Sequence, residues 1–98
     1  MTYDSGMKRL HAIVVGRVQG VGFREFVRSE GAARGLTGYV SNGVEGGSVE
    51  VVAEGDEASL SDLIDVLHKG PRFARVDSVD FTFSDATRAF NRFSVEHM

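Results

Sequence analysis

The sequence contains no cysteine, which excludes disulfides, a thiolate metal site and a cysteine nucleophile. It also lacks a long apolar run, so neither a signal peptide nor a membrane-spanning segment is predicted. Positive charge is in deficit, because 11 basic residues face 14 acidic ones, and the net charge of −3 argues against electrostatic binding to nucleic acid or to a membrane. These absences favour a cytoplasmic protein that acts on a small ligand through a local site.

The length of the chain limits its organisation. Ninety-eight residues, of which 42% are apolar, are enough for one compact domain and too few for a second. We interpret residues 1–7 as a loose N-terminal tail and residues 8–98 as the single domain. A monomer is the expected state for a domain of this size.

Two kinds of hydrophobic periodicity divide this domain into two similar halves. Alternation predicts strands at residues 8–18, 36–42, 49–54 and 79–84, with a short fifth strand at 93–95. A 3.6-residue period predicts helices over residues 23–34 and from Asp56 to Gly70. The first helix is expected to turn Phe23, Phe26, Val27 and Ala33 inward, and the seven phenylalanines are all assigned to the core.

The order β-α-β-β-α-β with a short final strand predicts an α+β fold of the ferredoxin-like kind. In this sandwich two helices cover one face of an antiparallel sheet. The first two strands then run parallel with the third between them, so both end at the same edge of the sheet, roughly 10 Å apart.

A glycine-rich segment, GRVQGVGFR from Gly16 to Arg24, joins the first strand to the first helix. Backbone N–H groups of such a turn, together with the first amides of a helix, can converge on one anion such as phosphate. Arg24 lies in the first helical turn, where the helix dipole disfavours a cation by roughly 0.3 to 1 kcal/mol. A bound anion would make a cation at this position favourable. The competing interpretation is a plain glycine-rich turn beside a solvated arginine.

The second strand ends at Ser41, Asn42 and Gly43, at the edge of the sheet where the glycine-rich segment also lies. Arg24 and Asn42 can therefore face a shared ligand. Asn-Gly is also a strong turn signal, and turn formation is the competing interpretation for Asn42.

Other chemistries find little support in the residues. The segment has no lysine or hydroxyl residue for a P-loop, and Glu25 stands where a dinucleotide fingerprint requires glycine. His11, His68 and His97 have no ligand spacing, so no metal site is predicted. An RNA-binding domain shares the element order, but the first and third strands lack the stacking aromatics.

Two motifs together resemble the signatures of the acylphosphatase family. Residues 16–24 resemble the first signature, and GYVSN at residues 38–42 resembles the strand that carries the second. Further similar segments follow in family order, namely GSVEV at 47–51, Glu54-Gly55, and residues 70–76, so the resemblance covers nearly all of residues 8–95. The chain ends VEHM where members often have a tyrosine after the last strand, and this departure concerns the contacts of the C-terminus.

The resemblance implies hydrolysis of the carboxyl-phosphate anhydride of a small-molecule acyl phosphate, without metal or cofactor. Arg24 would hold the phosphate and Asn42 would position the attacking water. Inorganic phosphate or sulfate can occupy the same site. Related domains also serve as binding modules in larger proteins, which is the alternative function. The backbone amides that would share the phosphate belong to Gln19, Gly20, Val21, Gly22 and Phe23.

Overall fold

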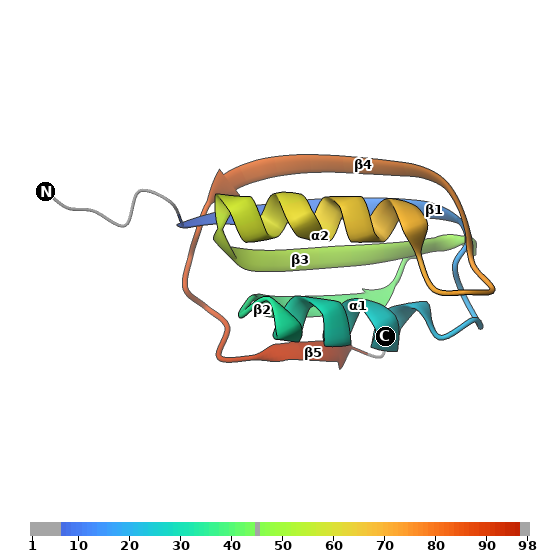
Figure 1. Cartoon of the computed structure of the whole chain (residues 1–98), viewed down its shortest axis with the longest axis horizontal. Coiled ribbons are helices and arrows are strands. Elements are labelled where there is room, and N and C mark those ends of the chain that lie inside the picture. Colours follow the sequence, from blue (N-terminus) through green and yellow to red (C-terminus); the bar gives the residue numbers. More distant parts are fainter. Residues whose placement is uncertain (1–6, 45, 97–98) are drawn as a thin grey trace, which may run out of the picture.

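The computed structural model describes residues 7–44 and 46–96 and consists of five strands and two helices (Figure 1). The predicted N-terminal tail lies outside the described residues except for Met7, which begins the first strand. The elements are β1 (Met7–Arg17), α1 (Phe23–Ala33), β2 (Thr37–Asn42), β3 (Ser48–Asp56), α2 (Glu57–Lys69), β4 (Arg75–Asp85) and β5 (Phe93–Glu96).

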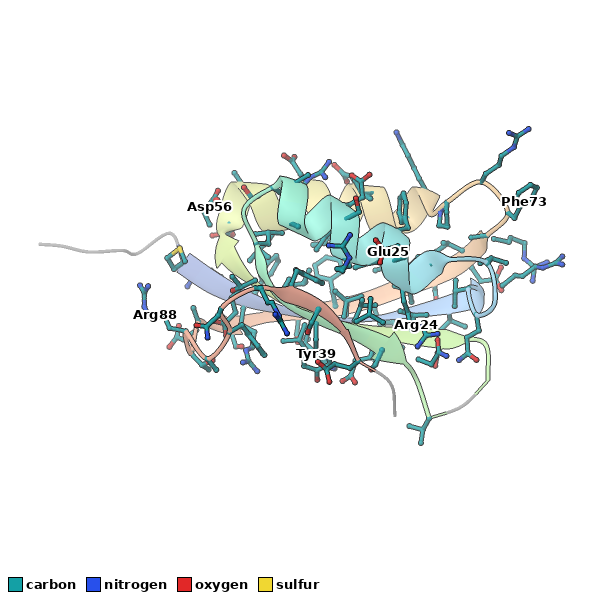
Figure 2. The ribbon with its side chains drawn as sticks, turned by 90° about the horizontal axis from the view of Figure 1, so that it is seen from below. Arg24, Glu25, Tyr39, Asp56, Phe73 and Arg88 are labelled. Atoms are coloured by element: carbon teal, nitrogen blue, oxygen red, sulfur yellow. The ribbon has the colours of Figure 1, made fainter. Side chains whose placement is uncertain are left out.

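The strands form one sheet in the order β4-β1-β3-β2-β5, and both helices cover the same face of it (Figure 2). The ferredoxin-like fold is therefore confirmed, with β3 between the parallel strands β1 and β2. The antiparallel description needs one correction, because β5 pairs with β2 in parallel. Residues 86–92 carry the chain from β4 at one edge of the sheet to the other edge (Figure 1). There the chain reverses its direction, so β5 runs opposite to β4 and therefore parallel to β2.

The core lies between the sheet and the helices. Asp56 caps α2 through a 3.1 Å hydrogen bond accepted from the Ser59 amide, as its position predicts. The apolar stripe of α2 and the alternating residues of β1 and β3 meet in one cluster. Among its fully buried members are Leu10, Ala12, Val14, Val49, Val51, Leu60, Leu63 and Leu67.

Helix α1 packs closely against β5, which changes its predicted inner face. Phe23 and Val27 are buried as expected, but Ala33 is exposed and Gly31 takes the inner position. A Cβ at Gly31 would stand 2.7 Å from the ring of Phe93. The small residue therefore sets how near the helix lies to the edge strand, and we expect Gly31→Ala to destabilise the fold by about 1 to 3 kcal/mol in urea unfolding.

Three phenylalanines correct the expectation that all seven belong to the core. Phe73, Phe81 and Phe83 are 74%, 43% and 38% exposed. Phe81 and Phe83 lie opposite Ala12 and Leu10 on the helix-covered face, but their strand β4 is at the edge of the sheet. The edge position leaves their rings partly uncovered, and they contact each other edge to face at 5.8 Å.

Glu54 at the end of β3 is buried, although the alternation of the strand predicts an outward position. Its side chain is 3% exposed and accepts hydrogen bonds from Arg9 Nε at 2.8 Å, from the Thr87 amide at 2.9 Å and from the Arg88 amide at 2.7 Å. Arg88 has a left-handed backbone, with φ of 60°, and the bond to Glu54 holds that turn. These bonds fasten the segment that leads from β4 to β5.

We expect the Glu54 carboxylate to make the stability of the fold vary with pH in the acid range. Burial opposes the ionisation of Glu54, but hydrogen bonds from Thr87, Arg9 and Arg88 outweigh it and lower the pKa from 4.5 to about 2. Because its pKa is lowered on folding, ionised Glu54 stabilises the fold fully above pH 4.5. This stabilisation, about 3 kcal/mol, is lost as the pH falls toward 2. Urea unfolding between pH 5 and pH 2 should therefore show a steeper loss for the natural protein than for Glu54→Gln. Equal slopes would contradict this role.

Candidate active site

The glycine-rich segment forms the turn between β1 and α1. Gly20 and Gly22 have φ of 76° and 78°, the left-handed region that favours glycine, and a Cβ at either would meet no atom within 4 Å. The backbone conformation, rather than lack of space, therefore calls for glycine here. Gly22 is the N-cap residue of α1, and no described side chain caps that helix end. A helix start without a side-chain cap, next to a glycine turn, is a kind of site that anions bind.

Two buried side chains and two hydrogen bonds hold this turn in place. The side chains of Val18 and Phe23 are each 1% exposed and anchor the turn in the core from both ends. The Gln19 side-chain amide donates to the Ser48 carbonyl at 2.8 Å, which ties the turn to the start of β3. The Gly16 amide also donates to the Gly47 carbonyl at 2.9 Å. The position of Gln19 therefore depends on a contact with a distant strand, which the sequence did not indicate.

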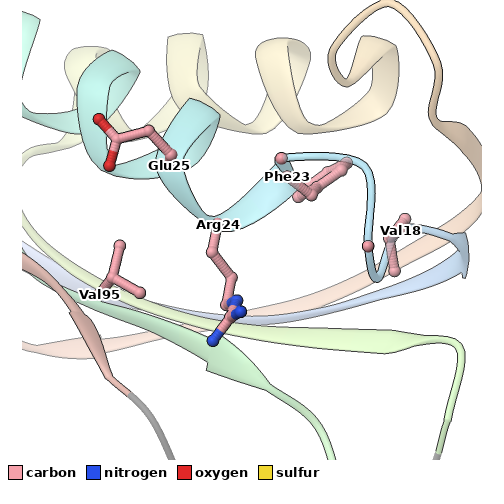
Figure 3. A pocket seen from close by; sticks show the side chains of 7 residues that line it. Val18, Phe23, Arg24, Glu25 and Val95 are labelled. Atoms are coloured by element: carbon pink, nitrogen blue, oxygen red, sulfur yellow. The ribbon is translucent and has the colours of Figure 1, made fainter.

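Arg24 lies in a pocket of about 330 Å³ at this end of the molecule. Figure 3 shows its side chain extending from the first turn of α1 toward the strands, with Phe23 and Val18 on one side. Of the predicted loop residues, Gly20, Gly22 and Phe23 line the pocket, whereas Gln19 and Val21 do not. Val21 packs against the core instead. The lining residues are Val18, Gly20, Gly22, Phe23, Arg24, Glu25 and Val95.

Asn42 ends β2, and the end of β2 lies beside the first turn of α1 in both views (Figures 1 and 2). The side-chain Oδ1 is buried and accepts no hydrogen bond from any described residue. A buried acceptor without a partner costs stability, typically about 1 to 3 kcal/mol, and requires an explanation such as a bound water or a catalytic role. Asn42 lines a separate cavity of about 600 Å³ together with Ile13, Val15, Ser41, Gly43, Val44, Ser48 and Glu50.

Neither of the two described histidines lines either pocket, although His11 contacts Glu50 of the larger cavity. His11 contacts Glu50 at 2.7 Å, and His68 contacts the Ile64 carbonyl at 3.0 Å within α2. His97 lies outside the described residues. Within residues 7–44 and 46–96 no group of three histidine or carboxylate side chains could hold a metal ion. None of the helices described is long and apolar enough to cross a membrane.

Fold and site together define a ferredoxin-like α+β domain with a glycine turn and an arginine-lined pocket at the start of its first helix. The acylphosphatase family model matches residues 10–95, and the chain belongs to the acylphosphatase family. The resemblance of the two motifs is thereby confirmed, together with the enzyme class, acylphosphatase (EC 3.6.1.7).

Similar proteins support this assignment over most of the chain. An acylphosphatase of Salinibacter ruber is 49% identical over 88 residues, which cover 90% of this chain and 92% of that protein. The crystal structure of the Bacillus subtilis acylphosphatase has a TM-score of 0.86 at 39% identity, covering 91% of this chain and 98% of that one. The Coxiella burnetii acylphosphatase structure has a TM-score of 0.88 at 36% identity, covering 98% and 100%.

Proposed function

We propose that this chain hydrolyses acyl phosphates at the end of the sheet where α1 begins. The observation that carries the proposal is the pocket in which Arg24 and the uncapped glycine turn lie together. The backbone amides of residues 19–23 and the guanidinium of Arg24 would surround the phosphate oxygens. A planar guanidinium can donate two parallel hydrogen bonds to a phosphate, which sets its orientation as well as its charge.

The proposed step is a single displacement at phosphorus. Water forms a bond to phosphorus, the bond from phosphorus to the acyl oxygen breaks, and the carboxylate leaves with the electron pair. A carboxylate is a good leaving group that needs no general acid, so positioning and charge stabilisation are enough. Asn42 lines a cavity separate from the pocket of Arg24, so the attacking water would have to reach from the phosphate to Asn42 across the end of β2. Oδ1 of Asn42 would accept a hydrogen bond from this water, which would supply the partner that it lacks among the described residues.

The proton of the attacking water is proposed to pass to the substrate's own phosphate. Glu25 is the one carboxylate among the residues that line the pocket. A hydrogen bond from Arg28 lowers the pKa of Glu25, so this group is a weak base at neutral pH. We expect no dependence of activity on a protein group that titrates near pH 6.5, and a kinetic pH profile that follows such a group would refute this route.

Hydrolysis of benzoyl phosphate by the purified protein in excess chelator tests the function itself. Turnover that persists in chelator supports a metal-independent acylphosphatase. Competitive inhibition by inorganic phosphate is also expected, because phosphate or sulfate can fill the cradle. Tight phosphate binding without any turnover would favour a binding module instead. The monomeric state and the cytoplasmic location remain predictions.

A further inference from the structure

The pocket around Arg24 is larger than a phosphate needs. A water molecule takes about 30 Å³ in the liquid, so the five heavy atoms of a phosphate fill at most about 150 Å³, whereas the pocket has about 330 Å³. A phosphate has tetrahedral geometry. When the loop amides and Arg24 hold its free oxygens, the acyl oxygen points out of the cradle into the rest of the pocket.

Two side chains outside the cradle form that remaining part. Figure 3 shows Glu25 and Val95 on one side of Arg24, opposite Phe23 and Val18. Val95 comes from the edge strand β5, is half-buried and packs against the core. The side chain of Glu25 is 66% exposed and extends from α1. The wall beyond the cradle is therefore aliphatic on one side and carries a carboxylate on the other.

Glu25 is held in an ion pair on the helix beside this wall. Arg28 donates to its two carboxylate oxygens from one helical turn away, at 2.9 and 3.1 Å from Nε. Arg28 itself does not line the pocket, so the carboxylate is the charged group of this pair that a ligand meets there. An anionic acyl tail would be repelled by it, whereas a neutral tail could lie against Val95.

We infer that the acyl group lies between Glu25 and Val95 and that Glu25 makes the site select neutral acyl groups over anionic ones. This inference rests on the proposed hydrolysis. Butyryl phosphate and succinyl phosphate are the matched probes, because both have four-carbon acyl groups and only the second ends in a carboxylate. The natural protein should have the higher kcat/KM for butyryl phosphate.

Glu25→Gln is the decisive variant, and Glu30→Gln is its control. Glu30 lies on the same helix and pairs with Arg34 at 2.7 Å, as Glu25 pairs with Arg28, but it does not line the pocket. Both variants change the net charge equally. At low ionic strength Glu25→Gln should reduce the preference for butyryl phosphate about threefold, because a unit charge acts through a partly aqueous medium at this range. High salt should diminish the effect.

The outcomes separate this inference from the function on which it rests. An unchanged preference in Glu25→Gln, or an equal change in Glu30→Gln, would overturn the role of Glu25 while hydrolysis itself stands. If the natural protein hydrolysed neither butyryl phosphate nor succinyl phosphate, both proposals would be overturned. Circular dichroism of the variants checks that α1 is retained.

Discussion

Arg24→Ala is expected to lower kcat/KM for benzoyl phosphate by roughly 10³-fold, by analogy with the arginine that stabilises phosphoryl transfer in other enzymes. The guanidinium lies in the pocket next to the glycine turn, so alanine removes the cation that would offset the negative charge of the phosphate. Inhibition by inorganic phosphate should weaken as well, because the same contact holds the product. Steady-state kinetics with benzoyl phosphate measures both effects.

Two further variants refine this prediction. Arg24→Lys keeps the charge but loses the paired hydrogen bonds, so it should recover only part of the activity. Arg17 is exposed at the end of β1 near the turn but outside the pocket, and Arg17→Ala tests the general positive potential of this end. We expect at most a few-fold loss for Arg17→Ala. Comparable losses in Arg17→Ala and Arg24→Ala would argue against a specific clamp.

Asn42→Ala is expected to lower kcat about 10²-fold and to leave KM nearly unchanged. The side chain is proposed to orient the water and not the phosphate, and loss of a positioning contact costs about this much. Inhibition by inorganic phosphate should persist in Asn42→Ala, in contrast to Arg24→Ala. Asn91 is exposed in the segment before β5, and Asn91→Ala is the matched control.

The same variant has a second readout in stability. Oδ1 of Asn42 is buried without a partner among the described residues, so alanine removes a polar atom whose burial is unfavourable. The free energy of unfolding of Asn42→Ala should equal or exceed that of the natural protein, while activity falls. A large loss of stability would show that Asn42 serves the Asn-Gly turn and would support the competing interpretation.

The local parts of the fold were predictable because each depends on neighbours in sequence. The stripe of leucines in α2, its Asp56 cap and the glycines that need positive φ follow from spacing and residue type alone. The element order also predicted that β3 lies between β1 and β2, so that β1 and β2 finish at the same end of the sheet. The candidate site could be located from these patterns before any contact was known.

The predictions of buried side chains were wrong where two segments far apart in the sequence together determine burial. Ala33 was expected to face inward, but Gly31 does so instead, because the inner face of α1 is set by the Phe93 ring on the last strand. Phe81 and Phe83 alternate like core residues, yet the edge position of β4 leaves them partly exposed. Periodicity shows that a residue faces one side of an element, but not whether another element covers that side.

The amino-acid sequence alone identified the family and predicted a phosphate site at residues 16–24 with Arg24 and Asn42 as candidate residues, because these inferences depend on motifs and topology. Three contacts became apparent only from the folded arrangement: Gln19 ties the glycine turn to Ser48, Glu54 holds the segment leading to β5, and Glu25 and Val95 line the same pocket. Each of those contacts joins segments far apart in the chain. Their distances follow from how closely the elements pack, and no local pattern of residues encodes that packing.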